Sequence, residues 1–289
     1  MHQTIQSAAQ IHAQPGSILG YTIQARIGHS ASAELYSAFD TDGQRVAIKH
    51  VQFRDARSTR MVAQLQNELE FSRVISHPGV RRVQSLEMEL NAQGELAEAA
   101  LVMEFIDGAP IRRLPGLSIG QSLAWFGQVA YALAAMHRCR FIHCDVKPGN
   151  ILAMRDDRIK LIDLGQSCPI GHRKAHASGT RDFMAPEQTR RMPLSPKTDI
   201  YGFGATLYWL LTGELVPAIA PEEALPMCSR AIPPMEINPR ISRPVSDLIM
   251  ACIQPDERRR PESFAQIAPR LELIGMETLR EQPALAAAG

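Results

Sequence analysis

The stretch from His143 to Asn150 reads H-C-D-V-K-P-G-N and brings three chemically useful side chains into one short loop. The carboxylate of Asp145 can accept a proton from a hydroxyl group, and the ammonium of Lys147 can neutralise nearby negative charge. The carboxamide oxygen of Asn150 can hold a metal ion that prefers oxygen ligands. A capping aspartate in an ordinary turn is the alternative interpretation. The presence of a base, a cation and a metal ligand within one short loop favours the interpretation as a catalytic loop.

Three further motifs occur in a fixed order along the chain. The apolar run V-A-I-K ends at Lys49, the triplet D-L-G begins at Asp163, and A-P-E ends at Glu187. Together with the loop, these motifs resemble the signature set of the protein kinases, and the Lys-Pro pair in the loop resembles the serine/threonine branch. The resemblance covers roughly residues 21–273 and departs from the pattern at Cys144, where Arg is usual, and at Leu164, where Phe is usual.

The resemblance implies a role in phosphoryl transfer from ATP for each of these side chains. Asp145 would be the catalytic base, and Lys147 would contact the transferring phosphate. Asn150 and Asp163 would share the Mg²⁺ ions. Lys49 would contact the α- and β-phosphates of the nucleotide.

The resemblance also implies that Lys49 pairs with a glutamate on the helix predicted near residues 59–76. Glu68 and Glu70 both precede the His77-Pro78 turn. Residues two apart lie on different faces of a helix, so only one of them can face the lysine. The spacing from the turn favours Glu68 as the fourth catalytic residue and leaves Glu70 as the alternative.

The nucleotide loop is the weakest part of the match. Gly28 remains from the expected G-x-G-x-x-G pattern, whereas Ser30 and Ala33 replace the other two glycines. Glycines let backbone amides approach phosphates without a Cβ atom in the way, so we expect weaker closure over ATP. The nucleotide-binding residues that the resemblance implies are Ile27, Gly28, Ser30, Ala33, Leu35, Ala47, Lys49, Met103, Glu104, Ile106 and Leu152.

Four of these nucleotide-binding residues have specific expected roles. Met103 resembles the gatekeeper, the segment from Glu104 to Ile106 resembles the hinge that pairs with adenine, and Leu152 would form the floor under the base. Core packing describes Met103 and Leu152 almost equally well.

Other residues are expected to support the catalytic loop without touching the substrate. By resemblance, Thr180 would hydrogen-bond to the catalytic aspartate and lysine, and Asp199 would hold the loop from below. Arg260 would pair with Glu187, and His143 would be a packed structural histidine.

The order of predicted elements gives an α+β fold of the two-lobed protein kinase type. Strands are expected at residues 21–27, 34–39, 45–53, 80–89 and 99–105, with helices at 59–76, 119–138, 198–211, 244–252 and 261–274. A small antiparallel β-sheet lobe with one main helix, at about 21–105, would precede a larger, mainly helical lobe at about 108–275. Residues 1–20 would form a flexible lead-in, and residues 276–289 a loosely ordered tail.

Composition limits the partners and the compartment. The chain has 289 residues and a formal net charge of +1, which gives no support to a nucleic-acid partner. Its longest apolar run, near 203–211, is too short to cross a membrane, and residues 1–14 contain no apolar signal core. The five cysteines show no metal-binding spacing and fit reduced thiols. We therefore expect a cytoplasmic protein without a membrane partner.

Two further function classes stay open beside a serine/threonine protein kinase that phosphorylates protein substrates and can phosphorylate itself. The degenerate glycine loop is compatible with a pseudokinase scaffold, and small-molecule phosphotransferases share an H-x-D-x-x-x-x-N loop. Cys144 lacks the guanidinium that would bind a phosphate on the activation loop. Activity is therefore expected not to depend on phosphorylation of that loop, which carries Ser167, Ser178 and Thr180. A redox role for Cys144 is the less favoured alternative because the thiol is expected to be buried.

Overall fold

The computed structural model describes residues 16–29, 33–53, 55–114, 116–177, 179–217 and 231–286, with the side chains of 56, 57 and 276–286 left aside. The chain forms two compact units. The N-terminal unit comprises Met1–Arg73 and Arg81–Ile106, and the C-terminal unit comprises Val74–Val80 and Asp107–Gly289. The main division between the two units follows Ile106. The short segment 74–80 belongs to the C-terminal unit because Leu161 donates its N–H to the carbonyl of Gly79 at 2.7 Å.

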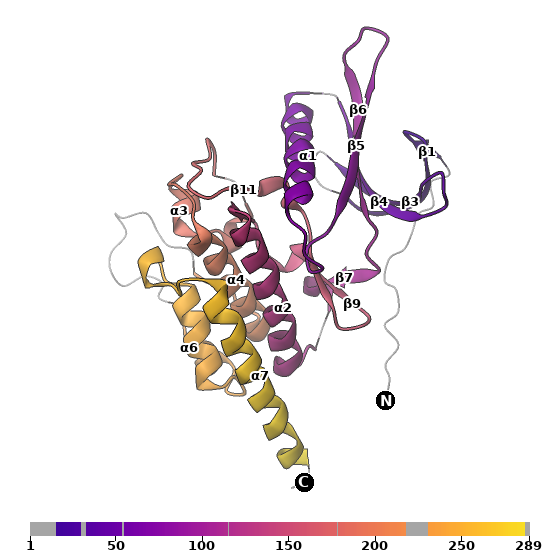
Figure 1. The fold of residues 1–289 in the computed structure, drawn as a ribbon. Helices are drawn as coiled ribbons and strands as arrows, with labels where there is room; N and C mark the ends of the chain where they lie inside the picture. Colours follow the sequence, from indigo (N-terminus) through magenta and orange to yellow (C-terminus); the bar gives the residue numbers. More distant parts are fainter. Residues whose placement is uncertain are drawn as a thin grey trace. The chain divides into compact units, whose positions relative to one another are not determined.

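The N-terminal unit is built on one antiparallel sheet of six strands (Figure 1). Its strands are β1 (Ser17–Ile18), β2 (Tyr21–His29), β3 (Glu34–Phe39), β4 (Arg45–Gln52), β5 (Val83–Leu90) and β6 (Leu96–Glu104), in the order β1-β2-β3-β4-β6-β5. The turn between β3 and β4 is fixed locally, since Asp40 accepts hydrogen bonds from the N–H groups of Asp42 and Gln44. Gly43 in this turn has φ +76°, which a glycine adopts without strain.

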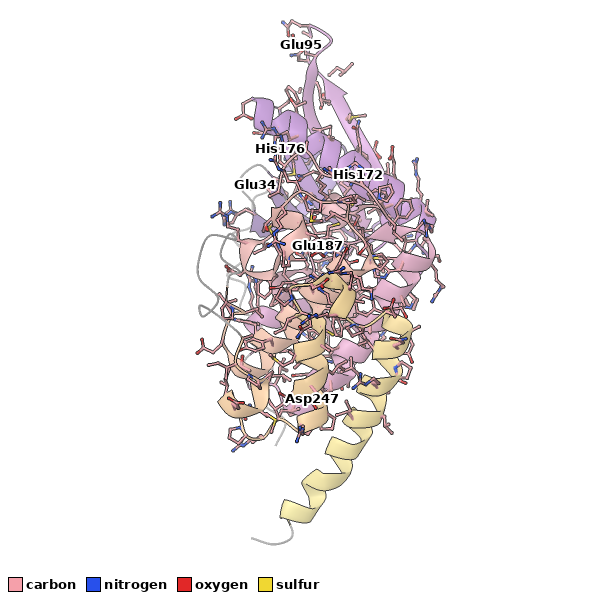
Figure 2. The ribbon with its side chains drawn as sticks, turned by 90° about the vertical axis from the view of Figure 1, so that its left-hand side faces the viewer. Glu34, Glu95, His172, His176, Glu187 and Asp247 are labelled. Carbon is pink, nitrogen blue, oxygen red and sulfur yellow. The ribbon has the colours of Figure 1, made fainter. Side chains whose placement is uncertain are left out.

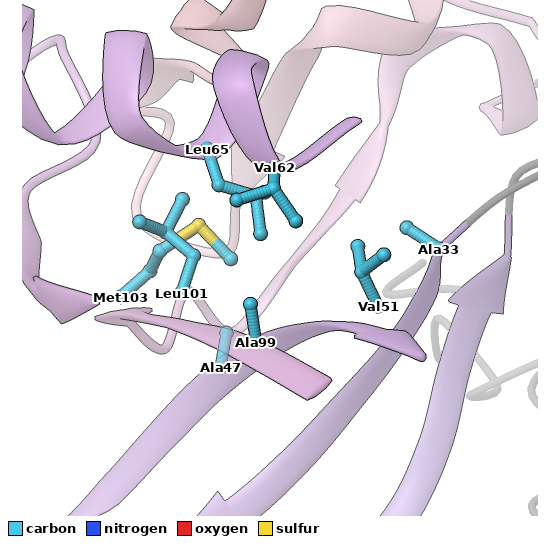
Figure 3. Packing of buried hydrophobic residues seen from close by; sticks show 8 residues of the cluster. All are labelled: Ala33, Ala47, Val51, Val62, Leu65, Ala99, Leu101 and Met103. Atoms are coloured by element: carbon cyan, nitrogen blue, oxygen red, sulfur yellow. The ribbon is translucent and has the colours of Figure 1, made fainter. Parts of the chain in front are cut away.

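Helix α1 (Ala56–Val74) covers one face of this sheet (Figure 3). Val62 and Leu65, three residues apart, turn toward Ala47, Leu101 and Met103 on the strands. Full burial of each large aliphatic side chain contributes about 1.5–3 kcal/mol, so this contact fixes which face of α1 looks at the sheet. The same face includes the position three residues further on, which is residue 68.

The C-terminal unit is mainly helical (Figure 1). Its helices are α2 (Ile119–Arg138), α3 (Pro186–Thr189), α4 (Pro196–Thr212), α5 (Pro234–Ile237), α6 (Arg243–Cys252) and α7 (Phe264–Ala286). Ser118 caps α2 by accepting the N–H of Gln121, and Gly213 ends α4 in a left-handed conformation.

The helices of the C-terminal unit pack closely around aromatic side chains. The ring of Phe203 meets Phe126 and Phe264 edge-on, with centroids 5.0 and 5.2 Å apart. Helix α4 also approaches α6 so closely that a Cβ atom at Gly204 would lie 2.5 Å from the Cβ of Cys252. Only glycine fits at this crossing.

Short elements of the C-terminal unit position the catalytic loop. A three-stranded sheet joins β7 (Gly108–Pro110), β9 (Ile151–Met154) and β10 (Ile159–Leu161), and a second pair joins β8 (Phe141–Ile142) to β11 (Cys168–Pro169). The 3-10 helices are η1 (Ile111–Arg113), η2 (Pro148–Asn150), η3 (Leu164–Gln166), η4 (Arg181–Phe183) and η5 (Glu257–Arg259). Loop 143–150 therefore runs from the end of β8 to the start of β9.

Two boundaries differ from the sequence expectation. Ser17–Ile18, expected within a flexible lead-in over residues 1–20, form strand β1, which pairs with β2. The last helix was predicted to end near Ile274, with a loosely ordered tail after Met276, yet α7 continues to Ala286. Alanine, leucine, glutamate and arginine dominate this stretch and are strong helix formers, which explains the extension. Within the described ranges, none of the helices is both long and apolar enough to cross a lipid bilayer.

Candidate active site

The catalytic loop is hydrogen-bonded to a buried carboxylate on α4. The two oxygens of Asp199 accept the backbone N–H groups of His143 and Cys144, each at 2.8 Å. Cys144 has φ +65°, so the chain makes a left-handed turn at this anchored point. His137, at the end of α2, adds a ring nitrogen 2.8 Å from Asp199.

The electrostatics of this anchor keep Asp199 charged. Burial alone raises the pKa of the Asp199 carboxyl, but the hydrogen bond and charge of His137, together with His143, lower it by more. The resulting pKa lies below the ordinary value. A charged Asp199 can accept both loop N–H groups at once, which fixes the start of the catalytic loop.

His143 occupies a purely structural position. Its side chain is fully buried, and Nδ1 lies 3.2 Å from the backbone N–H of Asp145, which donates to it. Nε2 lies 3.3 Å from the carbonyl of Ile162. The histidine ring thus joins the catalytic loop to the strand that leads to D-L-G.

Asp145 is held by donors on both of its carboxylate oxygens. Oδ1 accepts the backbone N–H of Thr180 at 2.9 Å and the hydroxyl of the same residue at 3.2 Å. Oδ2 accepts the ammonium of Lys147 at 2.6 Å and the amide of Asn150 at 3.0 Å. The side chain is buried, so these bonds fix its orientation.

Lys147 links the catalytic aspartate to the segment that precedes A-P-E. Its ammonium lies 2.7 Å from the hydroxyl of Thr180 as well as 2.6 Å from Asp145. About a quarter of its side chain is exposed, which leaves the cation accessible to a phosphate group. The predicted grouping of Asp145, Lys147 and Thr180 is therefore present in the structure.

The two candidate metal ligands lie on either side of β9 and β10. Asn150 uses its side-chain nitrogen to donate to the carbonyl and carboxylate of Asp145, which leaves its side-chain oxygen facing away as a possible ligand. Asp163 is half-buried and has φ +66°. The described residues contain no cluster of three or more His, Cys, Asp or Glu side chains that could hold a metal by themselves. This donor set fits Mg²⁺, which is commonly bound by one or two protein oxygens together with phosphates and water.

Lys49 and Glu68 form an ion pair inside the N-terminal unit. The ammonium of Lys49, on β4, lies 3.1 Å from Oε2 of Glu68, on α1. The Glu68 side chain is almost fully buried, whereas Glu70 is exposed. The structure thus resolves the choice that the sequence left between the two glutamates.

The expected hinge segment of the N-terminal unit lies at the end of β6. Met103 pairs in register with Ala47, and both side chains are buried. The guanidinium of Arg81 contacts the sulfur of Met103 at 3.5 Å. Glu104 accepts the N–H of Arg82, and Ile106 is buried. Met103 packs in the core of the N-terminal unit, and Leu152 is buried within the C-terminal unit. Burial is compatible with both interpretations of these two residues.

The described part of the expected nucleotide loop lies on β2 and at the start of β3. Gly28 pairs with Leu35 across β2 and β3, and a Cβ atom there would meet Leu35 only at an ordinary 3.7 Å. The methyl group of Ala33 is buried in the core beside Val51 (Figure 3). Ile27 and Leu35 are half-buried on the same two strands. Ser30 lies outside the described residues.

A buried ion pair supports the A-P-E end of the segment. Glu187, labelled in Figure 2, receives both arms of the Arg260 guanidinium at 2.7 and 2.9 Å. Thr198 donates its hydroxyl to the same carboxylate at 3.0 Å. Both charged side chains are almost completely buried, as the resemblance implied.

Three residues that support the loop had no role in the sequence interpretation. His137 contacts Asp199 from 62 residues away, and Gln188 donates its side-chain amide to the carbonyl of Cys144 at 2.8 Å. Cys168 brings its sulfur to 3.5 Å from that of Cys144. No spacing rule connects these positions, because each contact depends on how α2, α3 and β11 pack around the loop.

Comparison with known proteins points to the same chemistry. Residues 21–269 match the family model of the protein kinase domain. The serine/threonine-protein kinase PknA of Mycobacterium tuberculosis is 28% identical over 242 residues, which are 79% of this chain and 55% of the relative. A probable serine/threonine-protein kinase of Clostridium acetobutylicum is 26% identical over 274 residues, 90% of this chain and 41% of the relative.

The serine/threonine-protein kinase pkn2 of Myxococcus xanthus is 28% identical over 264 residues, 85% of this chain and 31% of the relative. The chain thus spans about half the length, or less, of these relatives. The family model nevertheless covers most of the chain and all of its catalytic motifs. The chain belongs to the protein kinase family.

Proposed function

We propose that this chain is an ATP-dependent serine/threonine protein kinase that transfers the γ-phosphate to hydroxyl groups of protein substrates. The observation that carries the proposal is the arrangement around Asp145, whose two oxygens receive Thr180, Lys147 and Asn150. A carboxylate so oriented can accept the proton of a substrate hydroxyl while the neighbouring ammonium meets negative charge. The names of the bacterial relatives support the same substrate type.

The residues of this chain divide the work of the proposed reaction. Asp145 orients the hydroxyl and takes its proton, and Lys147 neutralises charge on the phosphate being transferred. Lys49, fixed by Glu68, would hold the phosphates of ATP. Asn150 and Asp163 would hold Mg²⁺, which when bound neutralises phosphate charge.

A protein substrate is favoured by the segment from Thr180 to Glu187. Thr180 ties the end of this segment to the catalytic carboxylate, and the Arg260–Glu187 pair fixes the A-P-E motif behind it. Autophosphorylation is part of the proposal, because hydroxyl groups of the same chain are available to the same chemistry.

We further propose that activity does not depend on phosphorylation of the segment between Asp163 and Glu187. The side chain of Cys144 is buried with Ile142, Cys168 and Leu194, and this apolar cluster offers no guanidinium to a phosphate. Ser167 is buried as well, which disfavours it as an acceptor.

The test is transfer of ³²P from ATP to the chain itself, to a generic basic protein and to a panel of small alcohols. The proposal expects labelled serine or threonine in protein and none in the alcohols, and Asp145→Asn serves as the inactive control. Labelled alcohols would instead identify a small-molecule phosphotransferase. Nucleotide binding without any transfer would identify a pseudokinase.

A further inference from the structure

Two buried cysteines of the C-terminal unit face one another. The sulfur atoms of Cys144 and Cys168 lie 3.5 Å apart, although the residues are 24 positions apart in the sequence. Their side chains are 3% and 4% exposed and share an apolar cluster with Ile142 and Leu194. Both thiols are free.

Backbone structure holds the two cysteines in this relation. Cys168 pairs with Ile142 across the two short strands β11 and β8. Cys144 follows Ile142 by two residues, and its left-handed turn brings its side chain back toward the same place. On the other side, Asp199 and Gln188 fix the N–H and the carbonyl of Cys144. The contact is therefore built into the fold and does not depend on a surface rotamer.

We propose that Cys144 and Cys168 form a reversible intramolecular disulfide, which fastens the segment from Leu164 to Ala185 to the catalytic loop. A disulfide needs its sulfurs about 2.0 Å apart, so the present distance of 3.5 Å must close by about 1.5 Å. Because the backbone of Cys144 is anchored at both ends, most of this movement falls on β11, which has only two residues. The catalytic loop itself can then keep its position.

The positive charge of Lys174 near the pair favours a thiolate on Cys168. The hydrogen bond shared with Cys144, in which either sulfur can be the donor, and the charge of Lys174 lower the pKa of the Cys168 thiol despite its burial. The same hydrogen bond and burial raise the pKa of Cys144. Cys168 is thus the better thiolate, and thiolates are the form that reacts with oxidants.

A hydroperoxide is the oxidant that fits a buried pair of this kind, because hydrogen peroxide is about the size of water. The Cys168 thiolate attacks one peroxide oxygen, so that an S–O bond forms, the O–O bond breaks and hydroxide leaves, taking up a proton to become water. The sulfur of Cys144 then attacks that of Cys168, and the S–S bond forms as the S–O bond breaks and the proton of Cys144 leaves with hydroxide as a second water. Two thiols lose two electrons in total, and one peroxide becomes two waters.

The first experiment detects the bond itself. The full chain is treated with hydrogen peroxide, alkylated and digested with trypsin without reductant. The expected product joins peptide 141–155, which contains Cys144, to peptide 161–173, which contains Cys168. It should disappear on treatment with dithiothreitol and in Cys168→Ser, and persist in the matched control Cys139→Ser. Oxidation that ends as sulfinic acid on a single cysteine, or as links between chains, would overturn the proposal.

The second experiment measures what the bond does to the segment. Arg173 is exposed in the stretch that also carries His172 and His176, and trypsin can cleave after it in the native protein (Figure 2). A cross-link five residues before this site should limit local opening and slow cleavage by at least about threefold in the oxidised chain. Cys168→Ser should show equal rates with and without peroxide. Equal rates in the oxidised and reduced wild type would refute the fastening role. Neither experiment uses kinase activity, so both remain decisive if the proposed function fails.

Discussion

Thr180 donates twice to the same oxygen of Asp145, through its backbone N–H at 2.9 Å and through its hydroxyl at 3.2 Å. The hydroxyl also accepts the ammonium of Lys147 at 2.7 Å. One residue outside the catalytic loop therefore orients both the proposed base and the proposed phosphate-binding cation. This relationship joins the loop to the segment that leads to A-P-E, and it gives the first prediction.

Thr180→Val should slow phosphoryl transfer while leaving nucleotide affinity unchanged. The variant keeps the backbone N–H but loses the hydroxyl bonds to two charged groups, and such bonds contribute about 1.5–3 kcal/mol each. The backbone N–H of Thr180 and the ammonium of Lys147 still orient Asp145, so we expect the transition state to lose the energy of only one such bond and kcat to fall roughly 10- to 100-fold. Thr180→Ser keeps the hydroxyl and should retain most of the activity. If both variants transfer phosphate at the wild-type rate, the hydroxyl has no positioning role.

Asp145→Asn and Asp163→Asn should separate the base from the metal ligand. Asp145→Asn is expected to abolish transfer with nearly unchanged nucleotide affinity, because that carboxylate acts on the hydroxyl. Asp163→Asn should also weaken binding of Mg²⁺ with ATP, because it removes a charged oxygen ligand. Turnover and nucleotide affinity, measured for both variants, check this difference, and normal turnover by Asp145→Asn contradicts the mechanism.

The hydrogen bonds of charged Asp199 to the catalytic loop should make the free energy of unfolding fall at acid pH. The pKa of Asp199 is lowered in the folded chain, so the unfolded state binds the proton more readily. The stabilisation that the charged Asp199 contributes is fully present above the pKa of the unfolded state, about 3.9. It is lost as the pH falls through the lower pKa of the folded state. The measurement is the free energy of unfolding of wild type and Asp199→Asn between pH 7 and pH 3.

The stability gap between these two proteins should narrow as the pH drops below about 3.9. Asp247→Asn is the control, because Asp247 is exposed on α6 (Figure 2). A gap that stays constant with pH would show that Asp199 acts through its shape and not through its charge.

Removal of one partner from the buried Arg260–Glu187 pair should destabilise the C-terminal unit. Arg260→Met leaves Glu187 charged and buried, which costs about 3–5 kcal/mol. Denaturant unfolding measures this loss. Arg258→Met removes a guanidinium only two residues away, but an exposed one, and should leave the unfolding midpoint nearly unchanged. Equal effects of the two variants would mean that the buried pair contributes no more than a surface contact.

Phosphatase treatment of the purified chain should leave transfer to a protein substrate unchanged within a few-fold. The apolar cluster around Cys144 contains no guanidinium for a phosphate, and Ser167 is buried. The double variant Ser167→Ala with Ser178→Ala should behave in the same way. A loss of more than about tenfold, equivalent to 1.4 kcal/mol of transition-state stabilisation, would show that another basic group reads a phosphate.

The sequence by itself determined the family, the fold class and the local chemistry of the loop. These depend on short-range patterns: the H-C-D-V-K-P-G-N spacing fixes which groups share one turn, and apolar periodicity fixes which elements form. The fold class and the family were confirmed. The turn at Asp40 and Gly43 likewise follows from residues within a few positions of one another.

Tertiary structure decided the contacts between distant segments. It paired Lys49 with Glu68, the glutamate that the sequence spacing already favoured, placed the methyl group of Ala33 in the core and paired Cys144 with Cys168. It also continued α7 beyond the predicted end. Each of these outcomes depends on which face of one element packs against another, and that packing minimises exposed apolar area over the whole unit. A pattern within a few residues does not determine the apolar area that the whole unit buries. Only the folded chain therefore brings these side chains together.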